Sequence, residues 1–243
     1  MVKLPSMEEL LQAGLHFGHQ TSRWHPKAES YIFGQRNGIH IINLEKTAAA
    51  LEVALQFVEE LSSKGGQVLF VGTKKQAQEV VKKVALDTGS PYAVTRWLGG
   101  TLTNFSTLKH SLVDRLVSLR KQKEAGELEK YTKKERLDFD REIEDLDEQV
   151  GGLVPMQRIP EAVFILDLKQ EQTAFKEALR RGIKVIALTD TNINPEEVDY
   201  AIPGNDDALK AIEMITTLVG EAIKSGRVKA ATQPVAVAVA AAK

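Results

Sequence analysis

Two adjacent lysines after a glycine and a threonine, in the string Gly72-Thr73-Lys74-Lys75, are the residues best placed to do chemistry in this sequence. The string follows an apolar run and opens a helical pattern, a position at which free backbone N–H groups bind phosphate. It lacks the spacing of a Walker loop, and no Gly-x-Gly-x-x-Gly occurs in the chain. Two lysines at a helix N-terminus oppose the helix dipole, and a bound anion would relieve that repulsion. The string therefore fits an RNA phosphate, a small-molecule phosphate, or two merely exposed lysines.

Two further strings pair an arginine with a tryptophan: Arg23-Trp24-His25-Pro26-Lys27 and Arg96-Trp97-Leu98-Gly99-Gly100. Cationic side chains bind phosphates, whereas flat rings either stack on bases or fill a hydrophobic core. We expect Arg23, Lys27 and Arg96 to contact nucleic acid. Asn104, just beyond the second string, is placed to cap the helix expected to follow it.

Histidines and carboxylates are the candidate metal ligands, because the chain has no cysteine. His16 and His19 lie three residues apart and would need Asp190 or Asp206 to complete a site. We interpret the histidines as structural or hydrogen-bonding, with a metal as the alternative, and we predict no cofactor. Both aspartates lie at strand-to-helix junctions, where capping explains them without catalysis. Because neither Gly-x-Ser-x-Gly nor His-Glu-x-x-His occurs, we expect no catalytic residue.

The net charge of −1 conceals a strong segregation of charge along the chain. Residues 64–123 contain eleven lysines and arginines and three acidic residues, whereas residues 124–150 contain five and eleven. A positive segment in a nearly neutral protein predicts a localised surface that binds a polyanion. Clustered charges on solvated helix faces would give the same counts. Beyond residue 104 the candidate phosphate contacts in the positive segment are Lys109, Arg115, Arg120 and Lys121.

Alternating strands and helices must position these residues. An Asn-Gly pair between Tyr31–Phe33 and Ile39–Ile42 predicts a β-hairpin. The rest of the pattern predicts a parallel sheet covered by helices on both faces. Its expected strands are 68–71, 92–94, 162–167, 183–188 and an edge strand at 200–202, and its expected helices are 7–13, 44–62, 75–88, 170–181 and 206–224.

Residues 104–150 interrupt this alternation with a charged, apolar-poor stretch. Leucines recur every three or four residues from Leu108 to Leu119, and a second apolar set runs from Phe139 to Val150. Gly126 separates the two sets. The pattern predicts two antiparallel helices zipped along a narrow seam, each on the order of 30 Å long, that project from the sheet domain.

The composition excludes several classes of protein. Without cysteine there is no disulfide, thiolate nucleophile or iron–sulfur cluster. No uncharged apolar run approaches the ~18 residues that a membrane span needs. Charged residues stand near the N-terminus where a signal peptide would need an apolar stretch. We expect a cytoplasmic protein, or one of an organellar stroma or matrix, with residues 227–243 as a disordered tail.

The residues alone leave three functions open. The first is an RNA-binding structural protein, which the segregated charge favours. The second is an enzyme or sensor that binds a nucleotide at the carboxyl edge of the sheet, which the Gly72–Lys75 string favours. The third is an adaptor whose helical hairpin packs onto a partner helix.

Six strings in order resemble the bacterial ribosomal protein S2 family of the small (30S) ribosomal subunit. They are Leu10–His19, Arg23-Trp24, Asn37–Ile42, Phe70–Ala77, Arg96–Gly100 and Ile202–Asp207, and they extend over nearly the whole chain. The charged segment 104–150 resembles the insertion of bacterial and organellar members of that family.

The resemblance implies a non-enzymatic constituent of the small subunit, with a flavodoxin-like sheet and a projecting coiled-coil hairpin. It implies binding to 16S ribosomal RNA and to neighbouring small-subunit proteins, help in docking the messenger-binding ribosomal protein S1, and no homo-oligomer or membrane partner. We expect a sheet domain of residues 1–103 and 151–226, with 104–150 inserted. We expect the RNA-binding residues to be Arg23, Trp24, Lys27, Arg36, Lys74, Lys75, Arg96, Asn104, Lys109, Arg115, Arg120 and Lys121.

Overall fold

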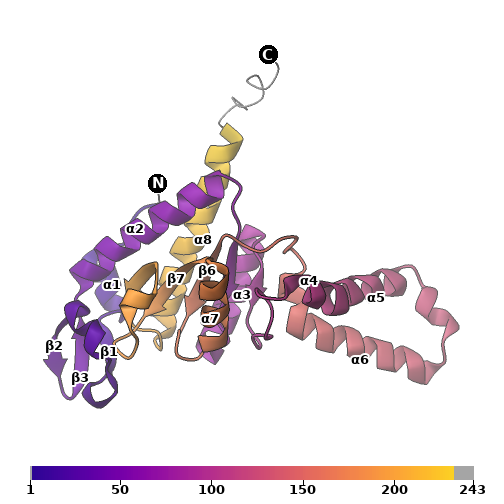
Figure 1. Cartoon of the computed structure of the whole chain (residues 1–243), viewed down its shortest axis with the longest axis horizontal. Coiled ribbons are helices and arrows are strands. Elements are labelled where there is room, and N and C mark those ends of the chain that lie inside the picture. Colours follow the sequence, from indigo (N-terminus) through magenta and orange to yellow (C-terminus); the bar gives the residue numbers. More distant parts are fainter. Residues whose placement is uncertain (1, 233–243) are drawn as a thin grey trace.

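A five-stranded parallel sheet forms the centre of the computed structural model, which describes residues 2–232 (Figure 1). The strand order is β5-β4-β6-β7-β8, which is 2-1-3-4-5 when these strands are counted along the chain, the order of flavodoxin-like sheets. The predicted edge position of the last strand is confirmed. The strands are β4 (Val68–Val71), β5 (Tyr92–Ala93), β6 (Ala162–Leu166), β7 (Lys184–Thr189) and β8 (Tyr200–Pro203).

Helices cover both faces of this sheet, as the continuous apolar strands predicted. Successive strand side chains point to opposite faces, so Phe70 and Phe164 pack together on one face with ring centroids 5.7 Å apart. Three helices cover that face: α2 (Leu44–Ser63), α3 (Lys75–Thr88) and α8 (Leu209–Thr232). On the other face Leu69 and Ile165 pack against α7 (Gln172–Arg181) and the root of the inserted segment.

Local signals in the sequence set several helix ends. At α1 (Met7–Gln12), the Ser6 side chain accepts from the Glu9 backbone N–H and the Glu9 carboxylate accepts from the Ser6 N–H, which together form a capping box. Gly182 ends α7 with φ +66°, in the left-handed region that glycine enters without strain. Short 3₁₀ turns occupy Thr21–Arg23, Pro26–Tyr31, Glu127–Lys130, Gly151–Leu153 and Pro195–Glu197.

A small antiparallel sheet, with strand order β1-β3-β2, precedes the parallel sheet in the chain. Its strands are β1 (Phe17–Gln20), β2 (Ile32–Arg36) and β3 (Ile39–Ile42). Asn37 and Gly38 form the turn of the predicted hairpin, both with positive φ, as a type I′ turn requires. Sequence reasoning did not anticipate β1, because its four residues lack an apolar alternation.

The inserted segment projects from the parallel sheet as two antiparallel helical arms (Figure 1). Its first arm joins α4 (Phe105–Leu108) and α5 (Asp114–Glu124) through a π-helical turn (Lys109–Val113), and its second arm is α6 (Lys133–Val150). Leu116 and Leu119 are fully buried between the arms, where they pack in one apolar cluster with Leu146 and Val150. These residues form an apolar cluster between the two arms.

The C-terminal helix is longer than predicted. We expected a disordered tail from residue 227, but α8 continues through Thr232. Contacts with other elements hold this last part: Arg227 donates to the carbonyl oxygen of Thr88, and Lys229 pairs with Glu59 at 2.9 Å. Residues 233–243 of the predicted tail lie outside the described residues. No helix within residues 2–232 combines the length and the hydropathy required to cross a bilayer.

Candidate nucleic-acid interface

The carboxyl ends of the parallel strands bring charged residues together from distant parts of the chain. β4 leads to Lys74, β6 to Asp167, β7 to Asp190, and β8 to Asp206 and Asp207. This edge, at the point where the strand order reverses, is where open α/β sheets bind ligands.

Lys74 is enclosed by carboxylates. Its Nζ lies 2.5 Å from Asp207 Oδ1, 3.2 Å from Asp206 Oδ1 and 3.4 Å from Asp167 Oδ2. Burial acts to lower the pKa of Lys74, but the hydrogen bond to Asp207 and the neighbouring negative charges outweigh it and raise the pKa overall. Lys74 therefore already has protein anions where the sequence suggested a phosphate.

His19 joins the same acidic group from β1. Its Nδ1 lies 2.9 Å from Asp190 Oδ2, and the hydrogen bond to Asp190 raises the pKa of His19. Burial, together with repulsion from Asp167 and Asp190, raises the pKa of Asp206 to about 7, and its Oδ2 has no hydrogen-bond partner within residues 2–232.

One nitrogen and two carboxylate ligand atoms could therefore hold a divalent cation at this edge. Ligand atoms of His19, Asp206 and Asp207 lie within 4.8 Å of one another, and imidazole with carboxylate is a donor set that zinc accepts. His16 is not part of this group, because its ring packs on Phe17 with centroids 3.9 Å apart.

The phosphate-like position before α3 is filled by a carboxylate of the protein itself. Glu171 Oε1 accepts the backbone N–H of Thr73 at 2.9 Å and also the Thr73 hydroxyl. Gln170 donates to the Thr73 hydroxyl oxygen at 2.9 Å. Burial raises the pKa of Glu171, and the hydrogen bonds from Thr73 act in the opposite direction. A second anion at this position would meet the Glu171 carboxylate, so the geometry does not favour a nucleotide phosphate here.

A second buried carboxylate, Glu177 on α7, anchors the root of the projection. Its Oε1 accepts from Trp97 Nε1 at 3.2 Å and from the Gly100 N–H at 2.7 Å, and its Oε2 accepts from the backbone N–H groups of Leu102 and Thr103. Burial acts to raise the pKa of Glu177, but these hydrogen bonds outweigh it and lower the pKa. Trp97 is accordingly a core residue, one of the two roles that the sequence left open for it.

Three of the five cations of the first arm pair with acids of the second arm across the seam. Arg115 Nε lies 2.9 Å from Glu142 Oε1, and Arg120 pairs with Asp147. A further pair joins Lys123 to α6, where its Nζ lies 2.7 Å from Asp140 Oδ1. The positive segment and the acidic segment that follows it therefore neutralise each other in part.

Five of the predicted contact residues are exposed cations that form no ion pair within residues 2–232. Lys75 begins α3, beside the enclosed Lys74, and Arg23 lies in the 3₁₀ turn after β1. The five are Arg23, Arg36, Lys75, Arg96 and Lys121.

Four other predicted RNA-binding residues contact groups of the protein itself. Lys27 pairs with Glu196, and Lys109 Nζ donates to Gln157 Oε1 at 2.9 Å. Asn104 stands at the N-cap of α4, but its side chain accepts from the Thr107 hydroxyl and caps no backbone N–H. Trp24 is 37% exposed, with its ring centroid 5.3 Å from that of His40.

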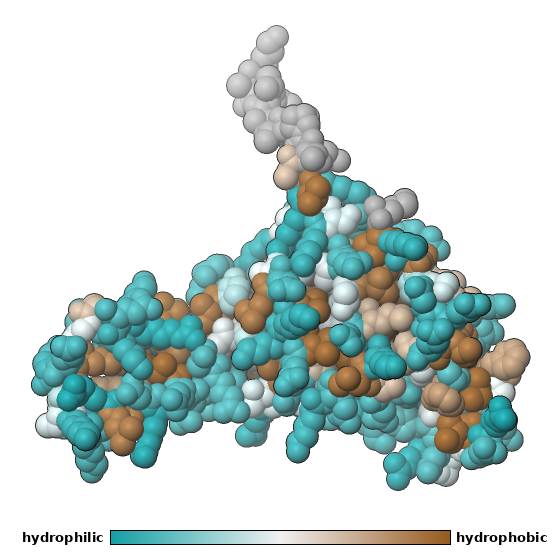
Figure 2. Space-filling view, turned by 180° about the vertical axis from the view of Figure 1, so that it is seen from behind, coloured by the Kyte–Doolittle hydropathy of each residue, from teal (hydrophilic) through white to brown (hydrophobic). Residues whose placement is uncertain are grey.

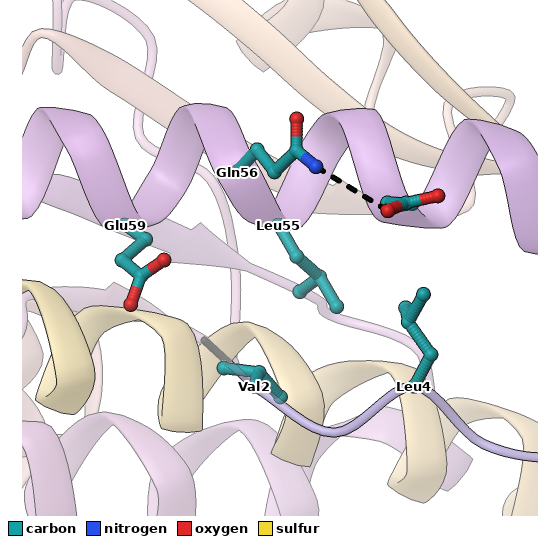
Figure 3. A pocket seen from close by; sticks show the side chains of 6 residues that line it. Val2, Leu4, Leu55, Gln56 and Glu59 are labelled. Carbon is teal, nitrogen blue, oxygen red and sulfur yellow. Dashed lines mark hydrogen bonds between the residues drawn. The ribbon is translucent and has the colours of Figure 1, made fainter.

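A small hollow beside α2 has the wrong chemistry for a site. The segment before α1 places Val2 and Leu4 toward Leu55, and Gln56 and Glu59 lie at the rim of the hollow (Figure 3). The Glu59 carboxylate already accepts from the Ser225 hydroxyl and pairs with Lys229, so the hollow offers mainly aliphatic surface.

Sequence reasoning missed four of the residues that organise this region: Asp167, Glu171, Glu177 and Asp207. One signal was available for Glu177, which falls between Ala174 and Ala178 on the apolar face of a predicted helix, where a charge requires a partner. For Asp167, Glu171 and Asp207 the partner Thr73 or Lys74 lies more than 90 residues away in the sequence.

Comparisons with known proteins agree on one family. Residues 10–226 match the family described as ribosomal protein S2. The small ribosomal subunit protein uS2 of Acinetobacter baylyi is 49% identical over 228 residues, which cover 94% of this chain and 91% of that protein.

Proposed function

The chain belongs to the ribosomal protein S2 family and is a non-enzymatic structural protein of the small ribosomal subunit in translation, and on this premise we propose that it binds 16S ribosomal RNA through its unpaired exposed cations. The observation that carries the proposal is the set Arg23, Arg36, Lys75, Arg96 and Lys121. Proteins bind folded RNA through cations spread over a surface, and each cation that contacts a phosphate releases counterions from the RNA.

The neutralised cations play a different part in this proposal. Lys74 holds the strand ends together, while Arg115 and Arg120 hold the two arms of the projection in register. We propose that the projection is a coiled-coil hairpin whose shape reaches RNA or protein beyond the sheet domain, with Lys121 as an exposed cation of its first arm that forms no ion pair within residues 2–232.

Charge reversal at two free cations tests the RNA contact. Lys75→Glu with Lys121→Glu should weaken binding to small-subunit particles lacking this protein, and the loss should be greatest at low salt. Lys82→Glu with Lys83→Glu, at exposed positions of α3, changes the net charge by the same amount and is the matched control. Equal binding of the double variant and the control at every salt concentration would contradict the proposal.

We propose that the antiparallel sheet is where this protein helps dock ribosomal protein S1. Phe33 on β2 is 78% exposed, and Phe17 on β1 is also exposed. Hydrophobic residues are visible on the surface at this end of the molecule (Figure 2). Exposed aromatic side chains are typical anchors of protein interfaces. Phe33→Ala should reduce the amount of ribosomal protein S1 retained on subunits without reducing incorporation of this protein, and unchanged retention would refute the proposal.

The two other functions left open by the residues have less support. Glu171 fills the candidate phosphate position, which disfavours a nucleotide enzyme or sensor. The leucines of the seam are buried between the protein's own arms, which leaves no apolar seam for a partner helix.

A further inference from the structure

Helix α7 presents positive charge to solvent and buries its negative charge. Glu171 at its N-cap and Glu177 inside it are both buried and hydrogen-bonded to protein groups. Lys176 and Arg180 are exposed, and neither forms an ion pair within residues 2–232. Acidic residues outnumber lysines and arginines in residues 151–226, so the sequence alone does not indicate this basic face.

A groove runs beside this face, between α7 and the loop 192–197. Lys169 and Lys176 stand on its rim, and its lining includes Leu179 and Ile193. Leu179 is 46% exposed, a high fraction for a leucine. Glu197 is the carboxylate in the lining, and its Oε1 accepts from Asn194 Nδ2 at 2.8 Å. Positive charge above apolar surface suits a ligand with phosphates and flat apolar rings.

The groove continues into the proposed RNA surface. His25 lines it directly, and Arg23 and Lys169 together line the adjoining hollow over the carboxyl edge of the sheet, where the carboxylates of Asp167 and Asp207 are paired with Lys74. A strand of RNA that contacts Arg23 would therefore reach Lys169 and then Lys176 without leaving the protein surface.

We propose that this groove binds an unpaired segment of ribosomal RNA, with phosphates on Lys169 and Lys176 and a base against Leu179 and Ile193, while Arg180 adds positive charge on the adjoining face of α7. The proposal rests on the RNA-binding function above and adds a second face to it. Charge complementarity and continuity with Arg23 favour RNA over a protein, because a protein partner would have to be both acidic and apolar at this place.

The test measures binding of the full-length chain to small-subunit particles that lack it, over a series of salt concentrations. Lys169→Ala with Lys176→Ala should reduce the slope of log K against log salt by about 1.4, since each lost single-strand phosphate contact removes about 0.7. Lys82→Ala with Lys83→Ala removes the same charge from the exposed side of α3, on the opposite face, and should leave the slope unchanged. Leu179→Ala should weaken binding without changing the slope.

A photocrosslinking residue at position 179 then identifies what occupies the groove. Crosslinks to RNA, together with the reduced slope, support the proposal. Crosslinks to protein alone, or a double variant with the wild-type slope and affinity, would overturn it while leaving the RNA-binding function intact. Failure of the wild-type chain itself to bind the particles would instead overturn the RNA-binding function.

Discussion

Glu177→Gln is the sharpest test of how the projection is held. The carboxylate accepts five hydrogen bonds from the root of the projection, two on Oε1 and three on Oε2. A glutamine has the same shape but only one acceptor oxygen. If that oxygen takes the place of Oε2, the amide N–H₂ faces the Trp97 Nε1–H and the Gly100 N–H, and two buried donors lose their acceptor.

The expected loss of stability follows from the free energy of leaving a buried hydrogen-bond donor without an acceptor. A buried donor left without a partner costs about 1–3 kcal/mol, so two of them should lower the free energy of unfolding by about 2–6 kcal/mol. Weaker bonds to the remaining oxygen, once the charge is gone, act in the same direction. Urea unfolding at neutral pH, followed by circular dichroism and by tryptophan fluorescence, measures the difference.

Glu213→Gln, at an exposed position of α8, is the matched control and should change the free energy of unfolding by less than about 0.5 kcal/mol. Hydrogen exchange should show the largest loss of protection at the Gly100 amide and the Trp97 indole N–H, the two donors left without an acceptor. A loss of less than about 1 kcal/mol for Glu177→Gln, with those two groups still protected, would show that Glu177 does not anchor the root.

Three other predictions concern separate parts of the fold. Arg115→Glu should lower the free energy of unfolding by up to about 1 kcal/mol, because the exposed ion pair with Glu142 joins the two arms. Glu142→Arg in the same chain should restore it in urea unfolding, and a double variant that does not recover would show that this ion pair does not stabilise the projection. Gly152→Ala should lower the melting temperature by several degrees, because its Cβ would lie 2.6 Å from a ring carbon of the tyrosine in β5, whereas Gly34→Ala, which meets no atom within 4 Å, is the control. A serine hydroxyl and a lysine on α8 lower the pKa of Glu59 to about 2, so the stabilisation is present above the ordinary pKa of 4.5 and is lost as the pH falls toward 2; urea midpoints against pH should show less of this loss in Glu59→Gln.

Local patterns predicted most of the fold. The Asn37-Gly38 pair predicted the hairpin turn, and the structure contains it. The Ser6 capping box and the glycine at the end of α7 are likewise set by residues a few positions apart. Continuous apolar runs indicated buried parallel strands because such strands have no solvent-facing side. Strand β1 was missed because its place depends on distant groups: the His19 N–H bonds to Asp190 Oδ1 and Thr191 Oγ1.

The candidate site was predicted less well, because the sequence shows which charges exist but not which of them meet. Lys74 and Lys75 are neighbours of the same type, yet one is enclosed by three aspartates and the other is exposed. The difference arises from the parallel sheet, which gathers the carboxyl ends of distant strands at one edge. No local pattern around residue 74 contains that information.

The same reasoning changes where RNA contact is to be expected. Counted along the chain, the first arm of the projection is one of the most positive parts of the protein, but its antiparallel neighbour supplies an acid to Arg115, Arg120 and Lys123. Helix α7 lies in a segment with more acids than bases, yet its acids point inward and its cations outward. A polyanion responds to the charge that remains after folding, so the face around Arg23 and α7 should attract RNA at least as strongly as the arm. Neutralising Lys169 and Lys176 should therefore reduce the salt dependence of binding more than neutralising Arg115 and Arg120, and the reverse order would mean that the ion pairs of the projection open in the assembled subunit.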